Sequence, residues 1–347
     1  MNFIGIRKGL LKKKKVIIPL AFFGLLLAIR LMVQPIIYKQ LNTFLSQFSP
    51  VITFHIEDLD INLLRGAYSF ESVTGKLKEN NHQFLTIEKV DTSIAWREIF
   101  KGKIVTDIVV TSLNLSYSKE LKEALAKTPK KEDAKEAKDK LFPVEVVRLD
   151  IKNSILKMDN FPAFTKIEGR ITNLLADKKN PLSFLNLKAT AFGHSVLKIA
   201  GHLKTLEEPI AWSIDTELQG FDLTAANQFL KEKVPLTFTK GKLDVYAEAK
   251  SEEGVIEGYV KPFMKNVDIM KAEENLKGAK HWFIEVIAAV GNLLLRTSDK
   301  KSVATLIPFT MDKSGVHVDK GEALSKAIQH GFEQKLNPGI EDRLKLE

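Results

Sequence analysis

From residue 51 onward, apolar and polar residues alternate with a period of two. The clearest runs are LNLKATAF and IAWSIDTEL, where one phase holds Leu185, Leu187, Ile210, Trp212 and Ile214. This alternation is typical of strands with one buried face. About a dozen such runs, at roughly 10- to 15-residue spacing, predict an antiparallel meander. The expected fold class is therefore mainly β (α+β).

The run over 103–117 differs, because its apolar residues occupy both phases. Ile104, Ile108 and Val110 share one phase, whereas Val109 and Leu113 belong to the other. A sheet that is apolar on both faces must cover both or offer one of them to an acyl chain. The predicted apolar groove consists of Ile104, Ile108, Val110, Leu185, Leu187, Ile210, Trp212 and Ile214.

Three other stretches have helical periodicity. Residues 34–50 predict a short amphipathic helix that lies at the membrane surface or packs under the first strands. Near the C-terminus, apolar stripes over 272–296 and 321–336 predict two amphipathic helices. The stretches VATLIPFTMD and SGVHVD between these helices predict a last hairpin.

Residues 118–141 interrupt the strand pattern with a run rich in Lys, Glu, Asp and Ala. Such a composition predicts a solvated helix or a flexible linker that buries no core. The insertion divides the expected strands into a membrane-proximal group within 34–117 and a distal β domain over 142–341.

An apolar run over 16–33 is near the roughly 20 residues that a helix needs to cross a bilayer. Arg30 lies close enough to its end to reach the headgroups. The basic tail 1–15 contains Lys12, Lys13, Lys14 and Lys15. Such a tail predicts a cytoplasmic N-terminus and an exported remainder.

A cleaved signal peptide is the alternative interpretation of this N-terminus. No cleavage site with small residues follows the run, so the sequence favours an uncleaved anchor. The expected location is a single pass through the inner (plasma) membrane, with the bulk of the chain in the periplasm.

Charge and composition exclude several functions. The net charge is +9, but the first fifteen residues carry six Lys or Arg and no acid. The rest of the chain has 46 basic and 43 acidic residues, which argues against nucleic-acid binding. There is no cysteine, so disulfides, thiolate metal sites and cysteine nucleophiles are absent.

No catalytic motif is present. The seven histidines include no H-E-x-x-H pair, and neither G-x-S-x-G nor a phosphate-binding G-x-x-x-x-G-K-[ST] loop occurs. Paired carboxylates cannot be assigned from spacing alone. We therefore expect a protein that is not an enzyme and that uses no cofactor or metal.

With its anchor and strands, the chain resembles the AsmA-like group of bacterial envelope proteins, in particular an uncharacterised branch with a single anchor. Residues 52–118, 254–270 and 304–341 carry the resemblance in their order of strands and turns. It implies a curved, groove-like antiparallel sheet in the periplasm and a role in envelope biogenesis, with lipid handling along the groove in longer relatives. The family pattern supplies no functional residue.

Two functions remain open from the sequence. The first is a membrane-anchored β-groove that binds or moves lipid, with membrane lipids and other envelope proteins as partners. The second is a non-catalytic structural or interaction protein of the envelope, with helices that close the groove. A hydrolase lacks any supporting motif.

Overall fold

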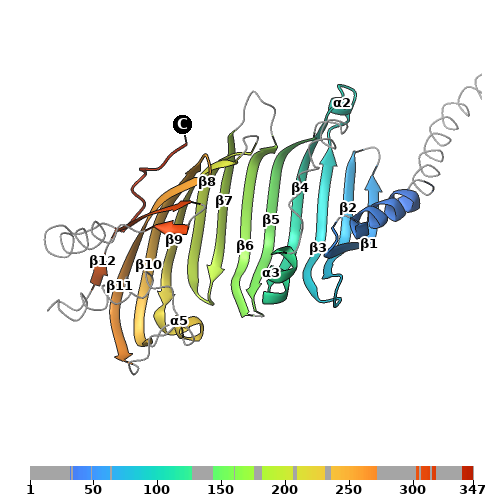
Figure 1. Cartoon of the computed structure of the whole chain (residues 1–347). Coiled ribbons are helices and arrows are strands. Elements are labelled where there is room, and N and C mark those ends of the chain that lie inside the picture. Colours follow the sequence, from blue (N-terminus) through green and yellow to red (C-terminus); the bar gives the residue numbers. More distant parts are fainter. Residues whose placement is uncertain are drawn as a thin grey trace, which may run out of the picture.

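The computed structural model describes residues 32, 34–47, 49–62, 65–126, 144–159, 161–175, 182–205, 209–230, 236–271, 302–304, 306–312, 315–317 and 338–346. Their strands form one sheet (Figure 1). β1 to β11 follow one another in chain order, β13 and β14 come next, and β12 pairs with β11. The strands are β1 (Ile52–Asn62), β2 (Ala67–Leu77), β3 (Gln83–Ile94), β4 (Ile104–Tyr117), β5 (Val144–Met158), β6 (Phe161–Leu175), β7 (Leu182–Ala191), β8 (Ser195–Lys204), β9 (Ala211–Asp222), β10 (Leu236–Glu252), β11 (Val255–Lys271), β12 (Ser302–Ala304), β13 (Ile307–Asp312) and β14 (Gly315–His317).

The predicted mainly β class is confirmed, but the predicted antiparallel order is wrong at one place. β4 and β5 run parallel, with Ile108 opposite Leu149 and Val110 opposite Ile151. A parallel pair needs a crossover of a dozen or more residues, and the insertion after β4 provides it. The two strand groups that the sequence separated are therefore neighbours in a single sheet.

A line of residues with positive φ crosses the first half of the sheet. Ser72, Ser112, Asn153 and Lys166 have φ between 45° and 55° in the middle of β2, β4, β5 and β6. A left-handed residue within a strand interrupts the alternation of the pleat and changes which face the following side chains occupy. At Asn153 and Lys166 the strand register also shifts, as in a β-bulge. In β4 the apolar positions accordingly change from even to odd numbers at Ser112.

Three short helices follow strands of the sheet: α2 (Trp96–Ile99), α3 (Lys119–Ala126) and α5 (Leu223–Leu230). In α3, which lies within the predicted solvated insertion, Leu121 and Ala124 are buried against Leu77 and Phe84. These two apolar residues at helical spacing are enough to pack α3 against the sheet, although the surrounding sequence is highly charged. Leu223 of α5 packs with Phe221 and Phe238 in a second cluster.

Residues 34–47 form the N-terminal helix, as predicted, and it packs along the edge strand β1. The Asn42 side chain donates to the carbonyl of Ile56 (3.0 Å) and accepts from the N–H of the same residue (2.8 Å). Edge strands expose unpaired backbone groups, and this helix covers some of them. Its outer face remains exposed at Ile36 and Phe44.

Several predicted segments fall outside the described residues: most of the span 16–33, and the helices 272–296 and 321–336. Among the helices that the structure does describe, none has the length and apolarity to cross a bilayer. The predicted last hairpin is confirmed, since β13 pairs antiparallel with β14.

Candidate functional site: an uncharged face across the sheet

Cross-strand pairing aligns two adjacent rows of side chains over β1–β11 and β13, and we call their common side the apolar face. The rows are two residues apart on every strand, so they share one side of the pleat. Neither row contains a charged residue. The first row is Leu59, Phe70, Val90, Val110, Ile151, Gly169, Leu187, Ile199, Thr216, Ala247, Val260 and Ile307. The second row is Ile61, Tyr68, Thr92, Ile108, Leu149, Ile171, Leu185, Gly201, Ile214, Ala249, Gly258 and Phe309.

The row between these two projects from the other side, which we call the polar face. It is composed of Asp60, Ser69, Asp91, Val109, Asp150, Arg170, Asn186, Ala200, Asp215, Glu248, Tyr259 and Pro308. Here Arg170 donates from Nε (2.6 Å) and Nη2 (3.0 Å) to the carboxylate of Asp150. These hydrogen bonds hold the pKa of Asp150 below its usual value. The sheet is thus strongly amphipathic.

The structure brings together seven of the eight residues that the sequence predicts for the groove. Ile108, Val110, Leu185, Leu187 and Ile214 lie in the two apolar rows. Continuing the alternation on the same strands adds Ile104 of β4 and Trp212 of β9 to this face.

Ile210 is the exception among the predicted groove residues. It precedes β9, where it is exposed and takes no part in the sheet. The topology residues Lys12, Lys13, Lys14, Lys15 and Arg30 lie outside the described part of the chain.

The positive φ of Ser112 explains why the sequence of β4 is apolar in both phases. Leu113 and Leu115 pair with Ile87 and Leu85. Both leucines follow Ser112, where the positive φ changes the phase of the side-chain alternation. Leu115 packs in the cluster under α3, on the apolar face. Val109, in contrast, lies in the polar row. Most of the apolar residues of β4 therefore serve one face rather than two.

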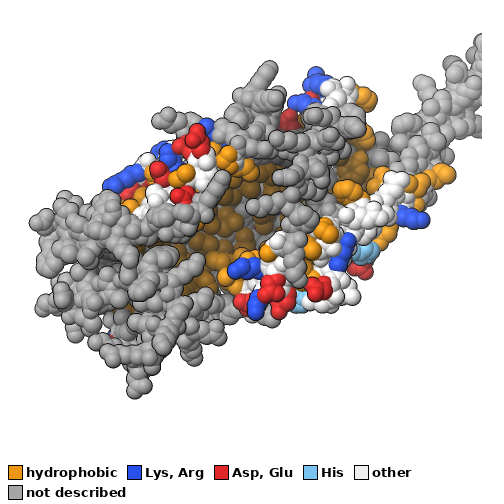
Figure 2. Space-filling view, viewed as in Figure 1, with side chains coloured by type: hydrophobic (Ala, Val, Ile, Leu, Met, Phe, Trp, Pro, Cys, Tyr) orange, Lys and Arg blue, Asp and Glu red, His pale blue; other side chains and the backbone are white. Residues whose placement is uncertain are grey.

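Figure 2 shows the apolar face hollowed over the middle strands, with hydrophobic side chains lining the hollow. Twelve strands at ~4.8 Å spacing extend over about 53 Å. One acyl chain occupies about half of the ~30 Å hydrocarbon core of a bilayer, or roughly 15 Å. The apolar face is thus long enough for more than one acyl chain.

One pair of polar side chains on the apolar face is satisfied within it. The hydroxyls of Thr92 and Thr106 share a hydrogen bond of 2.6 Å. Hydroxyls that pair in this way lower the cost of burial next to apolar groups. These hydroxyls do not supply an ionisable group. The surface is therefore chemically suited to a neutral, apolar ligand.

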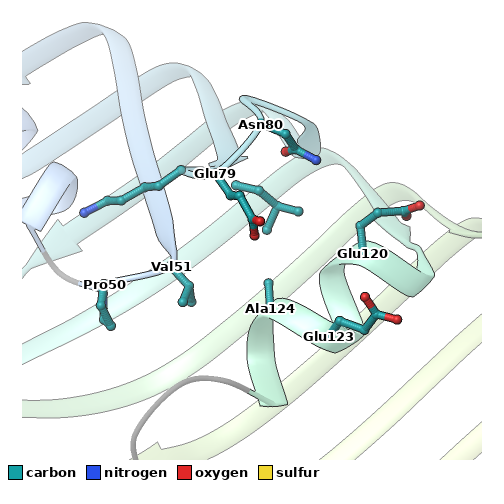
Figure 3. A pocket seen from close by; sticks show the side chains of 9 residues that line it. Pro50, Val51, Glu79, Asn80, Glu120, Glu123 and Ala124 are labelled. Carbon is teal, nitrogen blue, oxygen red and sulfur yellow. The ribbon is translucent and has the colours of Figure 1, made fainter.

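A pocket of about 420 Å³ opens beside α3, where β1 begins and the β2–β3 turn lies (Figure 3). Val51, Leu77 and Ala124 contribute its apolar part, whereas Glu120 and Glu123 of α3 contribute carboxylates. The end of the apolar face next to α3 is thus bordered by acidic side chains.

Within the described residues, no group of three or more His, Asp or Glu side chains is arranged to hold a metal ion. No protein-family model matches the chain, and no curated protein matches it. The candidate site therefore rests on the geometry of the sheet.

Proposed function

We propose that the chain is a membrane-anchored, AsmA-like envelope protein whose apolar face binds the acyl chains of lipids. One observation carries the proposal: two aligned rows without a charged residue cross twelve strands of the described structure. Burying apolar area from water is favourable by ~25 cal/mol per Å², and an acyl chain would supply the covering surface.

The anchored part of the proposal rests on the sequence. The apolar run over 16–33 directly precedes the N-terminal helix, and that helix covers β1 at one end of the sheet. An anchor at this position would bring the β1 end of the apolar face next to the bilayer. Lipid could then reach the groove without crossing a long aqueous gap, which is consistent with a role in envelope biogenesis.

The proposal is tested by lipid uptake. Purified, delipidated protein is mixed with vesicles that contain a fluorescent phospholipid, and protein-bound lipid is measured after separation. Leu187→Glu places a charge in the apolar row, whereas Asn186→Glu places the same charge on the polar face of the same strand. We expect uptake to fall about tenfold for Leu187→Glu, equivalent to ~1.4 kcal/mol, and to be unchanged for Asn186→Glu.

Both variants must retain the β-sheet circular dichroism of the parent chain for the comparison to hold. If the parent chain neither retains lipid during purification nor takes up the labelled phospholipid, the lipid-binding function is refuted. That result would favour a structural or interaction role in the envelope.

A further inference from the structure

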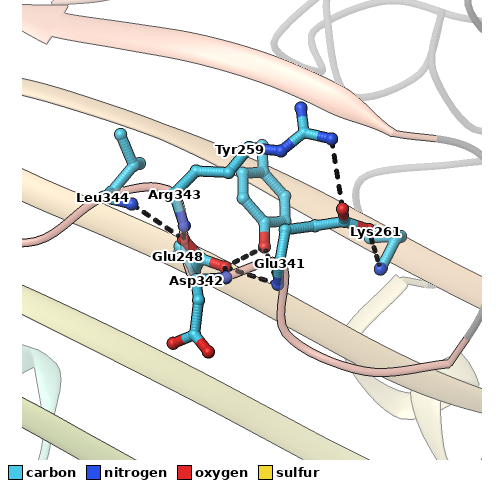
Figure 4. A network of polar contacts seen from close by, with 7 residues as sticks. All are labelled: Glu248, Tyr259, Lys261, Glu341, Asp342, Arg343 and Leu344. Atoms are coloured by element: carbon cyan, nitrogen blue, oxygen red, sulfur yellow. Dashed lines mark hydrogen bonds and ion pairs between the residues drawn. The ribbon is translucent and has the colours of Figure 1, made fainter.

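The C-terminal segment, residues 338–346, crosses the polar face over β10 and β11 (Figure 4). Its centre is the carboxylate of Glu248, whose residue is only 1% exposed. Oε1 accepts from the backbone N–H groups of Glu341 and Asp342, each at 2.6 Å. Oε2 accepts from the N–H groups of Arg343 (2.7 Å) and Leu344 (3.0 Å).

Two side chains of β11 complete this arrangement. The Tyr259 hydroxyl donates to Oε1 of Glu248 and accepts from the N–H of Glu341 at 2.8 Å. Lys261, also 1% exposed, donates to Oε1 of Glu341 at 2.6 Å. We call Glu248, Tyr259 and Lys261 the cradle.

A carboxylate as buried as Glu248 is stable only where donors replace the lost water. Burial by itself raises the pKa of Glu248, but hydrogen bonds from Tyr259 and from three backbone N–H groups outweigh it and leave the pKa below its usual value. The cradle and the segment are thus complementary: four successive donors meet one acceptor group.

The recognition is local and depends mainly on backbone. All of the contacts above come from four consecutive residues of the segment, 341–344, and from the side chain of Glu341. Glu341 and Glu248 are 93 positions apart in the sequence. Nothing in these contacts requires the segment to be covalently continuous with the sheet.

We propose that the cradle is a peptide-binding site that the chain's own C-terminal segment occupies. Its ligands are turn-forming peptides with four successive free backbone N–H groups and an acidic residue at the first of these positions. The second position favours Asp, Asn or Gly, because Asp342 has a φ of 57°. Proline is excluded at all four positions.

The site lies on the polar face and shares no residue with the two apolar rows. If the peptide-binding proposal is wrong, the lipid-binding proposal is unaffected, and if the lipid-binding proposal is wrong, the peptide-binding proposal is unaffected. A partner that carries such a peptide would compete with the resident segment, so the segment would act as an autoinhibitory occupant of the site.

The test uses the full chain with Asp342→Pro, a change that removes one N–H and forbids the positive φ. A fluorescent peptide of residues 338–347, PGIEDRLKLE, is titrated into this variant and followed by anisotropy. We expect saturable binding with one peptide per chain. Binding should weaken at least tenfold when Glu248→Gln is added, and also in the parent chain, whose site is occupied.

Two controls complete the design. Glu217→Gln, on the same face of the neighbouring strand β9, should leave peptide binding unchanged, and a peptide that carries Asp342→Pro should not bind. The absence of saturable binding to the Asp342→Pro chain would overturn the proposal, as would binding that is insensitive to Glu248→Gln. Slow hydrogen exchange at residues 341, 343 and 344 of the Asp342→Pro chain would also overturn it, because the segment would then be held by other contacts.

Discussion

At the scale of single residues, a few left-handed residues within strands decide which side chains share a face. Ser112 adopts a φ of 55° in the middle of β4, a conformation that costs most non-glycine residues about 1 kcal/mol or more. Because the alternation of side chains changes phase at Ser112, Leu113 and Leu115 lie on the same side of the sheet as Ile108 and Val110. The apolar face of the first strands therefore depends on a few left-handed residues.

Substitutions at Ser112 test this dependence. Ser112→Gly removes the Cβ penalty and should leave stability unchanged or raise it by up to ~1 kcal/mol. Ser112→Val forces a β-branched residue into the left-handed region and should cost ~2 kcal/mol or more. Urea unfolding followed by tryptophan fluorescence measures both, with Thr111→Val as the control in extended backbone. Equal stability of the Gly and Val variants would contradict the argument.

At the scale of elements, two helices use the same device to hold a strand. Asn42 of the N-terminal helix pairs with the N–H and C=O of Ile56, and Asn227 of α5 pairs with those of Phe238, both at 2.8 Å in the second case. Both asparagines begin the pattern N-x-F-L-x₄-P, at residues 42–50 and 227–235. The chain thus contains two related helix–strand units.

Removing one of these amides should loosen the element it holds. Asn227→Ala leaves the backbone groups of Phe238, a residue that is only 5% exposed, without that partner, and should destabilise the protein by ~2 kcal/mol. Asn227→Asp keeps the acceptor and loses the donor, so its effect should be intermediate. Thermal unfolding and hydrogen exchange at Phe238 measure the effect, and an unchanged exchange rate would argue against the role of the amide.

The sequence predicted the features that depend on the local order of apolar and polar residues within a strand. Strand alternation at Leu185, Leu187 and Ile214 assigns side chains to faces because pairing conserves the face from strand to strand. The parallel step between β4 and β5 was missed because its direction depends on the path of the crossover after Tyr117. The cradle was missed because no local pattern links Glu248 to a segment that lies 93 positions away.

At the scale of the whole molecule, the proposed topology places the sheet outside the cytoplasm. The chain has no cysteine, so a single introduced thiol reports its own location. Lys198→Cys, on the polar face of β8, should react with a membrane-impermeant maleimide in cells whose outer membrane alone is permeabilised. Lys8→Cys, in the basic tail, should react only after the inner membrane is opened. The opposite labelling pattern would refute the proposed orientation.

The parallel pairing of β4 with β5 also determines at which margin of the sheet, that is, at which ends of the strands, each connecting helix lies. In a strictly alternating series, β1 and β10 would point in opposite directions, being nine strands apart. The single same-direction neighbour at β4–β5 cancels one reversal, so both strands start from one margin. Among the described helices, α3 and α5 consequently lie at that margin and α2 lies at the opposite one, whereas the N-terminal helix runs along the edge strand β1. A tight turn in place of residues 118–143 would reverse the direction of every later strand and would place α5 at the opposite margin of the sheet.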